Sequence, residues 1–512
     1  MFRPFAVALL LAASCALPAG LPAQAEHQHA GAAPERLGHV EFPSGCRPPV
    51  QVRFERGVTL LHSFWYEAAG RSFREAATAD SSCAMAYWGL AMSVLHPLWT
   101  PPKPEERKQA LADAERAVRL SRPGTRQRDY AEAIAAYYRG ETVDDRARLA
   151  AYERAMAALA QRRVDDEEAR IFHALALIAL GQLDAGDSTH ARQRQAALIL
   201  EPLYRRHPDH PGIAHYLIHA YDSPTLARDG EPAADRYASI APSVPHAEHM
   251  PSHIYTRIGA WQRSIAANLK AAEAARKYEA AEHPGAMWDQ KAHALDYLAY
   301  AYLQLGRVAE ASAIAAQVAE VTETFPASSL TSDYALAAIP ARLALERDDW
   351  GAAEALPVRP APGWRGAEGI TRFARALGAA RAGHVPAARR EIDSLAGLER
   401  SLAVAGGAQT YWSTQVRIQR LAAGAWVALA AGDTTDALRQ AAAAADLDDT
   451  VEKHPVTPGA VRPARELYGD LLAEVGRPAE ARAAYELALA RQPGRARSVA
   501  AIAKLEKAVG QR

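Results

Sequence analysis

The stretch that decides the fold is residues 462–495, RPARELYGDLLAEVGRPAEARAAYELALARQPGR. It predicts two antiparallel helices. Gly469 and Ala481, at positions 8 and 20 of the stretch, are small enough for the two helices to approach closely, and Tyr485 fills the space between them. Pro493 ends the second helix. A helix pair of this kind cannot bury its apolar face alone, so it must stack on neighbouring pairs.

This unit resembles the tetratricopeptide repeat, whose period is about 34 residues. It matches that signature at Gly469, Leu472, Gly476, Ala481, Tyr485, Ala488 and Pro493. Weaker copies in the same register occur at Gly57, Leu60, Ala69, Phe73 and Ala76; at Ala174, Leu177 and Gly181; at Ala299, Tyr302, Gly306 and Ala311; at Ala376, Gly383 and Ala388; and at Ala425, Gly432 and Ala437. The sequence therefore predicts an all-α protein, a right-handed superhelix of tetratricopeptide-like helix-turn-helix repeats. A generic alanine-rich helical bundle is the alternative.

The N-terminus has the pattern of an export signal over residues 1–25. Arg3 precedes a short apolar run, and Ala23-Gln24-Ala25 is a small-x-small cleavage site. Attachment to a lipid through Cys15 is an alternative to cleavage after Ala25. Residues 26–40 are expected to be a flexible lead-in. The repeats then divide into an N-terminal set over residues 41–324 and a C-terminal set over residues 325–512.

The composition narrows the location and the partners. Lysine plus arginine equals aspartate plus glutamate at 59 each, so charge gives no case for nucleic acid or an anionic membrane as a partner. No later stretch approaches the roughly 18 apolar residues of a membrane span. We therefore expect a periplasmic or secreted protein. Cys46 and Cys83 are expected to form a disulfide in that compartment, although two separate thiols remain an alternative.

Histidines are concentrated in one segment, because seven of the eighteen lie within residues 207–253. His215, His219 and Asp222 are spaced i, i+4 and i+7, which places them on one face of a helix. His249 and His253 repeat the i, i+4 spacing around Pro251. Two imidazoles on one helix face can reach the same metal ion.

Three interpretations of this segment remain open. The first is a metal site for zinc, with copper or nickel as further candidates. Its ligands would come from His215, His219, Asp222, His249, His253 and His293, with His246, Asp296 and Glu248 in support. The second is a structural network in which the histidines cap helices and hydrogen-bond across repeats. The third is an exposed groove for a peptide or a small ligand.

Aromatic residues form two groups in the first repeats, around Trp65 and around Trp88 and Trp99, with His62 beside them. The simpler interpretation is a core contact between neighbouring helices. The alternative is that His62, Trp65, Trp88 and Trp99 form an aromatic wall of a binding groove.

Several phrases together resemble a group of exported bacterial tetratricopeptide-repeat proteins without assigned activity. They are residues 61–65, 83–89, 207–222 and 246–253. The resemblance implies the repeat fold and export, and it implies no reaction. Repeat arrays usually provide binding surfaces, so we expect a scaffold that binds a protein, a peptide or a small ligand on its concave surface, without an enzymatic activity. The alternative is a metal-binding protein or a metal-dependent hydrolase, with Glu248 or Asp222 as its general base.

Overall fold

The computed structural model describes residues 1, 35–99, 101–140, 144–184, 186–360 and 364–510. Residues 36–512 form one compact unit. The predicted boundary between residues 324 and 325 falls inside this unit, within the short strand β2 (Thr324–Phe325). Residues 2–34, which include nearly all of the predicted export signal, lie outside the described residues.

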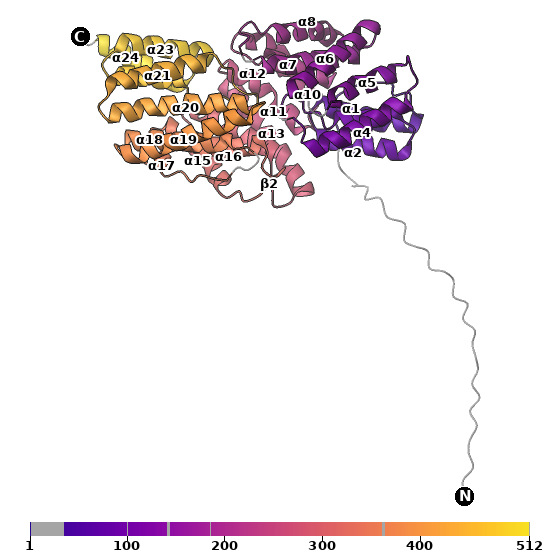
Figure 1. Ribbon diagram of the computed structural model, residues 1–512, viewed down its shortest axis with the longest axis horizontal. Helices are drawn as coiled ribbons and strands as arrows, with labels where there is room; N and C mark the ends of the chain where they lie inside the picture. The colour runs from indigo at the N-terminus through magenta and orange to yellow at the C-terminus, as the bar shows by residue number, and fades with distance from the viewer. Residues whose placement is uncertain (2–34, 100, 141–143, 185, 361–363, 511–512) are drawn as a thin grey trace. The chain divides into compact units, whose positions relative to one another are not determined.

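The compact unit is built almost entirely of helices that follow one another along the chain (Figure 1). The first group is α1 (Pro48–His62), α2 (Tyr66–Ala79), α3 (Ala84–Met92), α4 (Pro104–Leu120), α5 (Arg126–Tyr138), α6 (Asp145–Arg162), α7 (Glu167–Leu183), α8 (Ala191–Arg206), α9 (Pro211–Tyr221), the 3-10 turn η1 (Ala227–Gly230) and α10 (Glu231–Ile240). The middle group is α11 (Pro245–His249), α12 (Pro251–Arg257), α13 (Trp261–Glu282), β1 (Met287–Trp288), α14 (Asp289–Gln304) and α15 (Val308–Ala319). After β2 come α16 (Leu330–Glu346), α17 (Trp350–Glu354), α18 (Gly366–Arg381), α19 (Val385–Ala405), α20 (Gln409–Ala430), α21 (Thr434–Asp449), α22 (Ala464–Glu474), α23 (Pro478–Arg491) and α24 (Ala496–Gly510).

The helix pairs pack as the repeat signature predicts. In the last pair, α22 and α23, a Cβ added at Gly469 would lie 2.7 Å from the ring of Tyr485. In the first pair, α1 and α2, a Cβ added at Gly57 would lie 2.6 Å from the ring of Phe73. The same close contact of glycine with an aromatic ring therefore joins the helices at both ends of the array, and the fold is an all-α helical repeat.

Glycine also marks the turns between paired helices. Gly306, Gly383, Gly432 and Gly476 each follow the first helix of a pair and have φ between 68° and 85°. This left-handed conformation ends helices and favours glycine. Gly181 departs from the pattern, because it lies inside α7 rather than at a turn.

Two expected connections are more ordered than the sequence indicates. Residues 36–40, predicted to be flexible, run along the body of the unit: Leu37 and Val40 are buried, and the amide of His39 donates to the carbonyl of Asp209. Five prolines or glycines predict a long connection rather than one helix between Asp222 and Pro245, and this connection contains η1 and α10. Apolar side chains in both segments explain the order, since they contribute to the main hydrophobic core.

Cys46 and Cys83 are joined by a disulfide with Cα atoms 5.2 Å apart. This bond ties the start of α1 to the start of α3. In the described part of the chain, no helix combines the length and the apolar character needed to cross a bilayer.

Candidate metal centre

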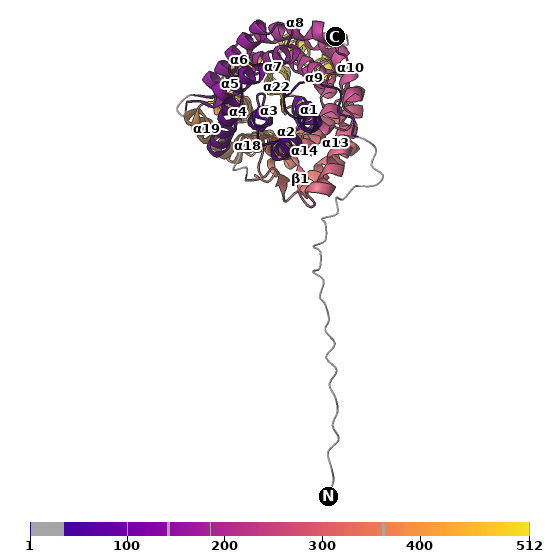
Figure 2. The ribbon, with the colours of Figure 1, turned by 90° about the vertical axis from the view of Figure 1, so that its right-hand side faces the viewer.

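Four helices bring six buried histidines together. Neighbouring elements support these four helices: α1 packs against α9, and α13 packs against both α14 and β1 (Figure 2). His215 and His219 lie on one face of α9, and the short helices α11 and α12 contact α10 and α13. The full set is His215 and His219 from α9, His246 and His249 from α11, His253 from α12 and His293 from α14.

The first histidine cluster consists of His215, His219 and His246, all of which are buried. Nε2 of His215 lies 3.1 Å from Nε2 of His219 and 3.1 Å from Nε2 of His246. Nδ1 of His215 lies 2.7 Å from the carbonyl oxygen of His62. A carbonyl can only accept, so this Nδ1 carries the proton, and Nε2 of neutral His215 presents a lone pair to the other two rings.

The second histidine cluster consists of His249, His253 and His293, which are also buried. Nδ1 of His249 donates to Oδ1 of Asn268 at 2.6 Å. The amide of Asn268 is fixed in this orientation because its Nδ2 donates to the carbonyl of Ser264 at 2.8 Å.

His253 in this cluster is oriented in the same way by a carboxylate. Its Nδ1 donates to Oδ2 of Asp222 at 2.9 Å. His249 and His253 therefore both hold their proton on Nδ1 when neutral, and both present a lone pair at Nε2. These two Nε2 atoms lie 3.0 Å apart, so two acceptors face each other at hydrogen-bond distance.

The spacing of the nitrogens suits a metal ion. Three nitrogens each about 2.0–2.1 Å from an ion at tetrahedral angles lie about 3.3 Å from one another. The measured nitrogen separations of 3.0 and 3.1 Å are close to that value. The ligand atoms of each cluster all lie within 4.8 Å of one another.

Asp222 supports the centre from outside the two clusters. Its Oδ1 accepts from Nε of Arg257 at 2.8 Å, and its Oδ2 accepts from Nζ of Lys453 at 2.9 Å. Burial alone would raise the pKa of Asp222, but the two cations hold it well below its usual value. The carboxylate is therefore charged, fully engaged and a weak base, which suits a group that orients His253.

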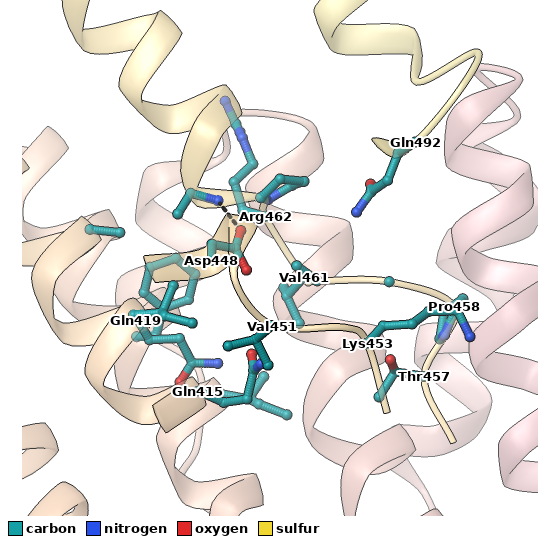
Figure 3. Close-up of a pocket in the computed structure, with 18 of the residues that line it drawn as sticks. Gln415, Gln419, Asp448, Val451, Lys453, Thr457, Pro458, Val461, Arg462 and Gln492 are labelled. Atoms are coloured by element: carbon teal, nitrogen blue, oxygen red, sulfur yellow. Dashed lines mark hydrogen bonds between the residues drawn. The ribbon is translucent and has the colours of Figure 1, made fainter. Parts of the chain in front are cut away.

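The segment between α21 and α22 closes this side of the centre. Lys453 and Thr457 both lie on it (Figure 3). The carbonyl of Thr457 accepts from the hydroxyl of Tyr297 at 3.0 Å, and Tyr297 stacks on His253 with ring centroids 5.1 Å apart. The same segment lines a small cavity of about 100 Å³.

Burial acts on all six imidazoles. It lowers the pKa of every one of them, because a charged imidazolium loses its hydration in the interior. The pKa lies well below its usual value for five of them, His215, His219, His246, His249 and His293. The pKa of His253 is lowered less, because the nearby carboxylate of Asp222 partly offsets the effect of burial. Neutral rings with free lone pairs are the form that binds metal ions.

A third group, His62, Glu168 and His210, has a different character. Nε2 of His62 and Nε2 of His210 bind the two oxygens of Glu168 at 2.9 and 2.8 Å. Nδ1 of His62 lies 3.0 Å from the hydroxyl of Tyr216, and Nδ1 of His210 accepts from the amide of Ile213 at 3.3 Å. Every ring nitrogen has a protein partner, so this group is a complete structural network.

A cavity of about 1700 Å³ adjoins the first histidine cluster, and His219 and His246 form part of its wall. Phe64 lines the cavity and lies against the cluster, with its ring centroid 4.3 Å from that of His215. Its backbone has φ of 55°, a left-handed conformation that is uncommon outside glycine. Further aromatic side chains in the wall are Trp65, Tyr66, Trp99, Trp288, Trp364, Tyr411 and Trp412.

Several sequence-predicted residues lie elsewhere than expected. Asp296 is outside the clusters, with Oδ1 3.5 Å from the guanidinium of Arg342. Glu248 is neither in a cluster nor in the cavity wall. Trp65 and Trp99 do line the cavity, whereas Trp88 packs in the core between Phe42 and Tyr130, and His62 belongs to the structural network with Glu168.

Sequence reasoning missed Asn268 and Lys453 altogether, and it included Phe64 only in the aromatic group around Trp65. Arg257 had one available signal, because it follows His253 by four residues on α12 and therefore shares its face. Lys453 had none, since it lies 231 residues from the carboxylate that it binds.

No protein-family model matches the chain, and no curated protein matches it. Among solved structures, the chain is similar to human IFIT1 in a dimer with m7Gppp-AAAA, with 14% identity, a TM-score of 0.40, and 88% of this chain and 91% of that chain covered. It is also similar to the APC/C hetero-tetramer Cut9-Hcn1, with 14% identity, a TM-score of 0.36 and coverage of 85% and 77%. A third is the P58(IPK) TPR domain, with 12% identity, a TM-score of 0.20 and coverage of 90% and 99%.

Proposed function

We propose that the chain is a helical-repeat protein that binds two transition-metal ions, one in each histidine cluster, beside a cavity that takes a small ligand. The observation that carries the proposal is the pair of Nε2 atoms of His249 and His253, 3.0 Å apart. Both rings donate from Nδ1 to fixed acceptors, Asn268 and Asp222. Two facing lone pairs repel each other unless a cation lies between them.

A proton is the simplest such cation, and the surroundings oppose it. An imidazolium in this place would be buried and would lie near Arg257 and Lys453, which already neutralise Asp222. A metal ion instead gains a coordinate bond from each neutral ring. The outer hydrogen bonds of His215, His249 and His253 are of the kind that orients metal-binding histidines.

The ligand set narrows the choice of ion. Three neutral imidazoles suit zinc, copper, nickel and iron, and the harder ions calcium and magnesium prefer oxygen. Each cluster has three histidines and leaves a position open for water or a ligand. The cavity beside the first cluster is large enough for a drug-sized molecule, and its aromatic wall favours a ligand with apolar surface.

This proposal unites the two functions expected from the sequence, a binding scaffold and a metal protein. The zero net charge supports a ligand other than nucleic acid. The N-terminal segment and the disulfide support action outside the cytoplasm. A hydrolytic reaction has less support, since Asp222 is a weak base and Glu248 is not among the residues that supply the ligand atoms of either cluster.

The test is the metal content of the mature chain, purified without an affinity tag and titrated with zinc or copper before dialysis. We expect two ions per chain, and one ion per chain in His219→Ala and in His249→Ala. His384→Ala is the matched control, because His384 is exposed and pairs with Glu354 at the surface; it should keep two ions. Circular dichroism verifies that each variant is folded. Fewer than about half an ion per wild-type chain, or two ions retained in either folded cluster variant, would refute the proposal.

A further inference from the structure

The two histidine clusters adjoin each other. The ring centroids of His219 in the first cluster and His253 in the second lie 6.0 Å apart. Those of His246 and His249, which belong to different clusters on the same short helix, lie 6.1 Å apart. An ion about 2 Å from its nitrogens in each cluster is therefore within reach of a small molecule bound to the other. Metal ions that share one bridging ligand lie about 3.5–4 Å apart.

The charge of the centre restricts which pair of ions it holds. The two clusters contain six neutral imidazoles and no carboxylate among the described residues. The neighbouring carboxylate, Asp222, is already neutralised by Arg257 and Lys453. Repulsion between two ions scales with the product of their charges, so two divalent ions repel each other about four times as strongly as two monovalent ions at the same distance.

Copper is the imidazole-binding metal that is stable as a monovalent ion. Zinc, which the sequence favours for a single site, has only the divalent state. Two divalent ions in this buried place require an anion between them. Two Cu(I) ions require none, and three nitrogen ligands satisfy each of them.

We propose that the two clusters together hold one pair of copper ions, which in the Cu(I) state binds a dioxygen molecule between them. This inference rests on the proposed function and goes beyond it, because it makes the two sites one centre with a defined ligand. Each Cu(I) transfers one electron to dioxygen. The products are two Cu(II) ions and one bridging peroxide dianion, and no proton or outside reductant is needed for this step.

This step leaves the charge of the buried centre unchanged. Two Cu(I) ions carry a charge of two, and two Cu(II) ions with a peroxide dianion carry the same charge. A neutral diatomic ligand also suits the crowded surroundings of the first cluster, because the ring of Phe64 lies against His215, His219 and His246 with centroids 4.3, 5.6 and 5.8 Å away. Phe64 thus narrows the space between the first cluster and the larger cavity, which His219 and His246 also line, and this favours small ligands at the cluster.

The test uses the full chain, loaded with two equivalents of Cu(I) under anaerobic conditions and then exposed to dioxygen. We expect uptake of one dioxygen per two coppers in an oxygen electrode. We also expect a paramagnetic resonance signal far below the copper content, because two Cu(II) ions that share one bridge couple their spins. His249→Ala is the internal control: its single remaining copper, oxidised with ferricyanide, should give close to one spin per copper.

The outcomes separate the two proposals. Two bound coppers with a full spin count after oxidation, or with no dioxygen uptake, would overturn the shared centre and leave the two metal sites standing. Failure of the wild-type chain to retain copper or zinc would overturn both. Protein loaded with two zinc ions should take up no dioxygen, and uptake there would show that the copper pair is not its cause.

Discussion

Asp222 contributes both to the stability of the metal-free protein and to the order of the second histidine cluster, so one substitution there tests both. Its carboxylate binds Arg257, Lys453 and His253 and is almost fully buried. Asp222→Asn keeps the shape and one oxygen for His253 but removes the charge, so two buried cations lose their counter-ion. Removing one partner of a buried ion pair costs about 3–5 kcal/mol.

Two features place the expected loss at the lower end of that range, near 3 kcal/mol. Arg257 keeps a second partner, since its guanidinium lies 3.2 Å from Glu452. Lys453 can lose its proton, because burial lowers its pKa to about 8 even with Asp222 opposing the shift. A neutral lysine costs less than an unpaired ammonium in the interior.

The assay is urea unfolding of chelator-treated protein at pH 7, followed by circular dichroism and tryptophan fluorescence so that agreement of the two probes establishes a two-state transition. Asp209→Asn is the matched control. Asp209 pairs with Arg236 at 3.3 Å at the surface, where both side chains are more than half exposed. Such a pair contributes about 0–1 kcal/mol. If the loss in Asp222→Asn is no larger than in Asp209→Asn, the assignment of Asp222 as the buried counter-ion is wrong.

Two further predictions concern the repeats. Gly469→Ala should destabilise the chain by about 1–3 kcal/mol, because the new Cβ meets the ring of Tyr485 at 2.7 Å. The control is Gly397→Ala, at a helical glycine with open space around it, which should stabilise the chain by about 0.5–1 kcal/mol. Equal urea midpoints for the two variants would contradict the repeat contact. Glu466→Gln should lose stability in a pH-dependent way. Burial alone would raise the pKa of Glu466, but Arg495 outweighs it and the pKa falls from 4.5 to about 2, so its contribution is complete above about pH 4.5 and is lost as the pH falls toward 2. Urea unfolding at pH 6, 4.5 and 3 should show the gap between wild type and variant narrowing, and a constant gap would contradict this role.

The repeats were predictable from sequence because their contacts are local. Gly469 and Tyr485 lie sixteen residues apart in one helix pair, and the spacing of the two residue types alone indicates the contact. Gly181 shows where this reasoning fails. The buried apolar run Ala174–Leu180 continues the helix up to it, and the side chain of Gln193 covers it, so this glycine serves close packing rather than a turn. Spacing predicts a contact only where the neighbouring residues allow the turn.

The histidine site was predictable in part for the same reason. His215 and His219 share a helix face, and the structure brings them together. His246 was expected only in support of the metal site. The structure begins a short helix, α11, at Pro245, which brings His246 fully into the first cluster, and a second, α12, at Pro251, since proline is well tolerated at a helix start. Division of the six histidines into two clusters depends on the angle between these helices, which the sequence pattern does not specify.

The two clusters depend on different parts of the chain for their orientation. In the first cluster, His215 is oriented by the carbonyl of His62 at the end of α1. In the second, His253 is oriented by Asp222, which Lys453 holds from the segment between α21 and α22. Ions that bind only the folded chain stabilise it. Occupation of the second cluster should therefore stabilise the C-terminal segment, whereas occupation of the first should stabilise the N-terminal repeats. A shared ligand between the ions would join these two effects, so that the pair stabilises the whole array more than either ion alone.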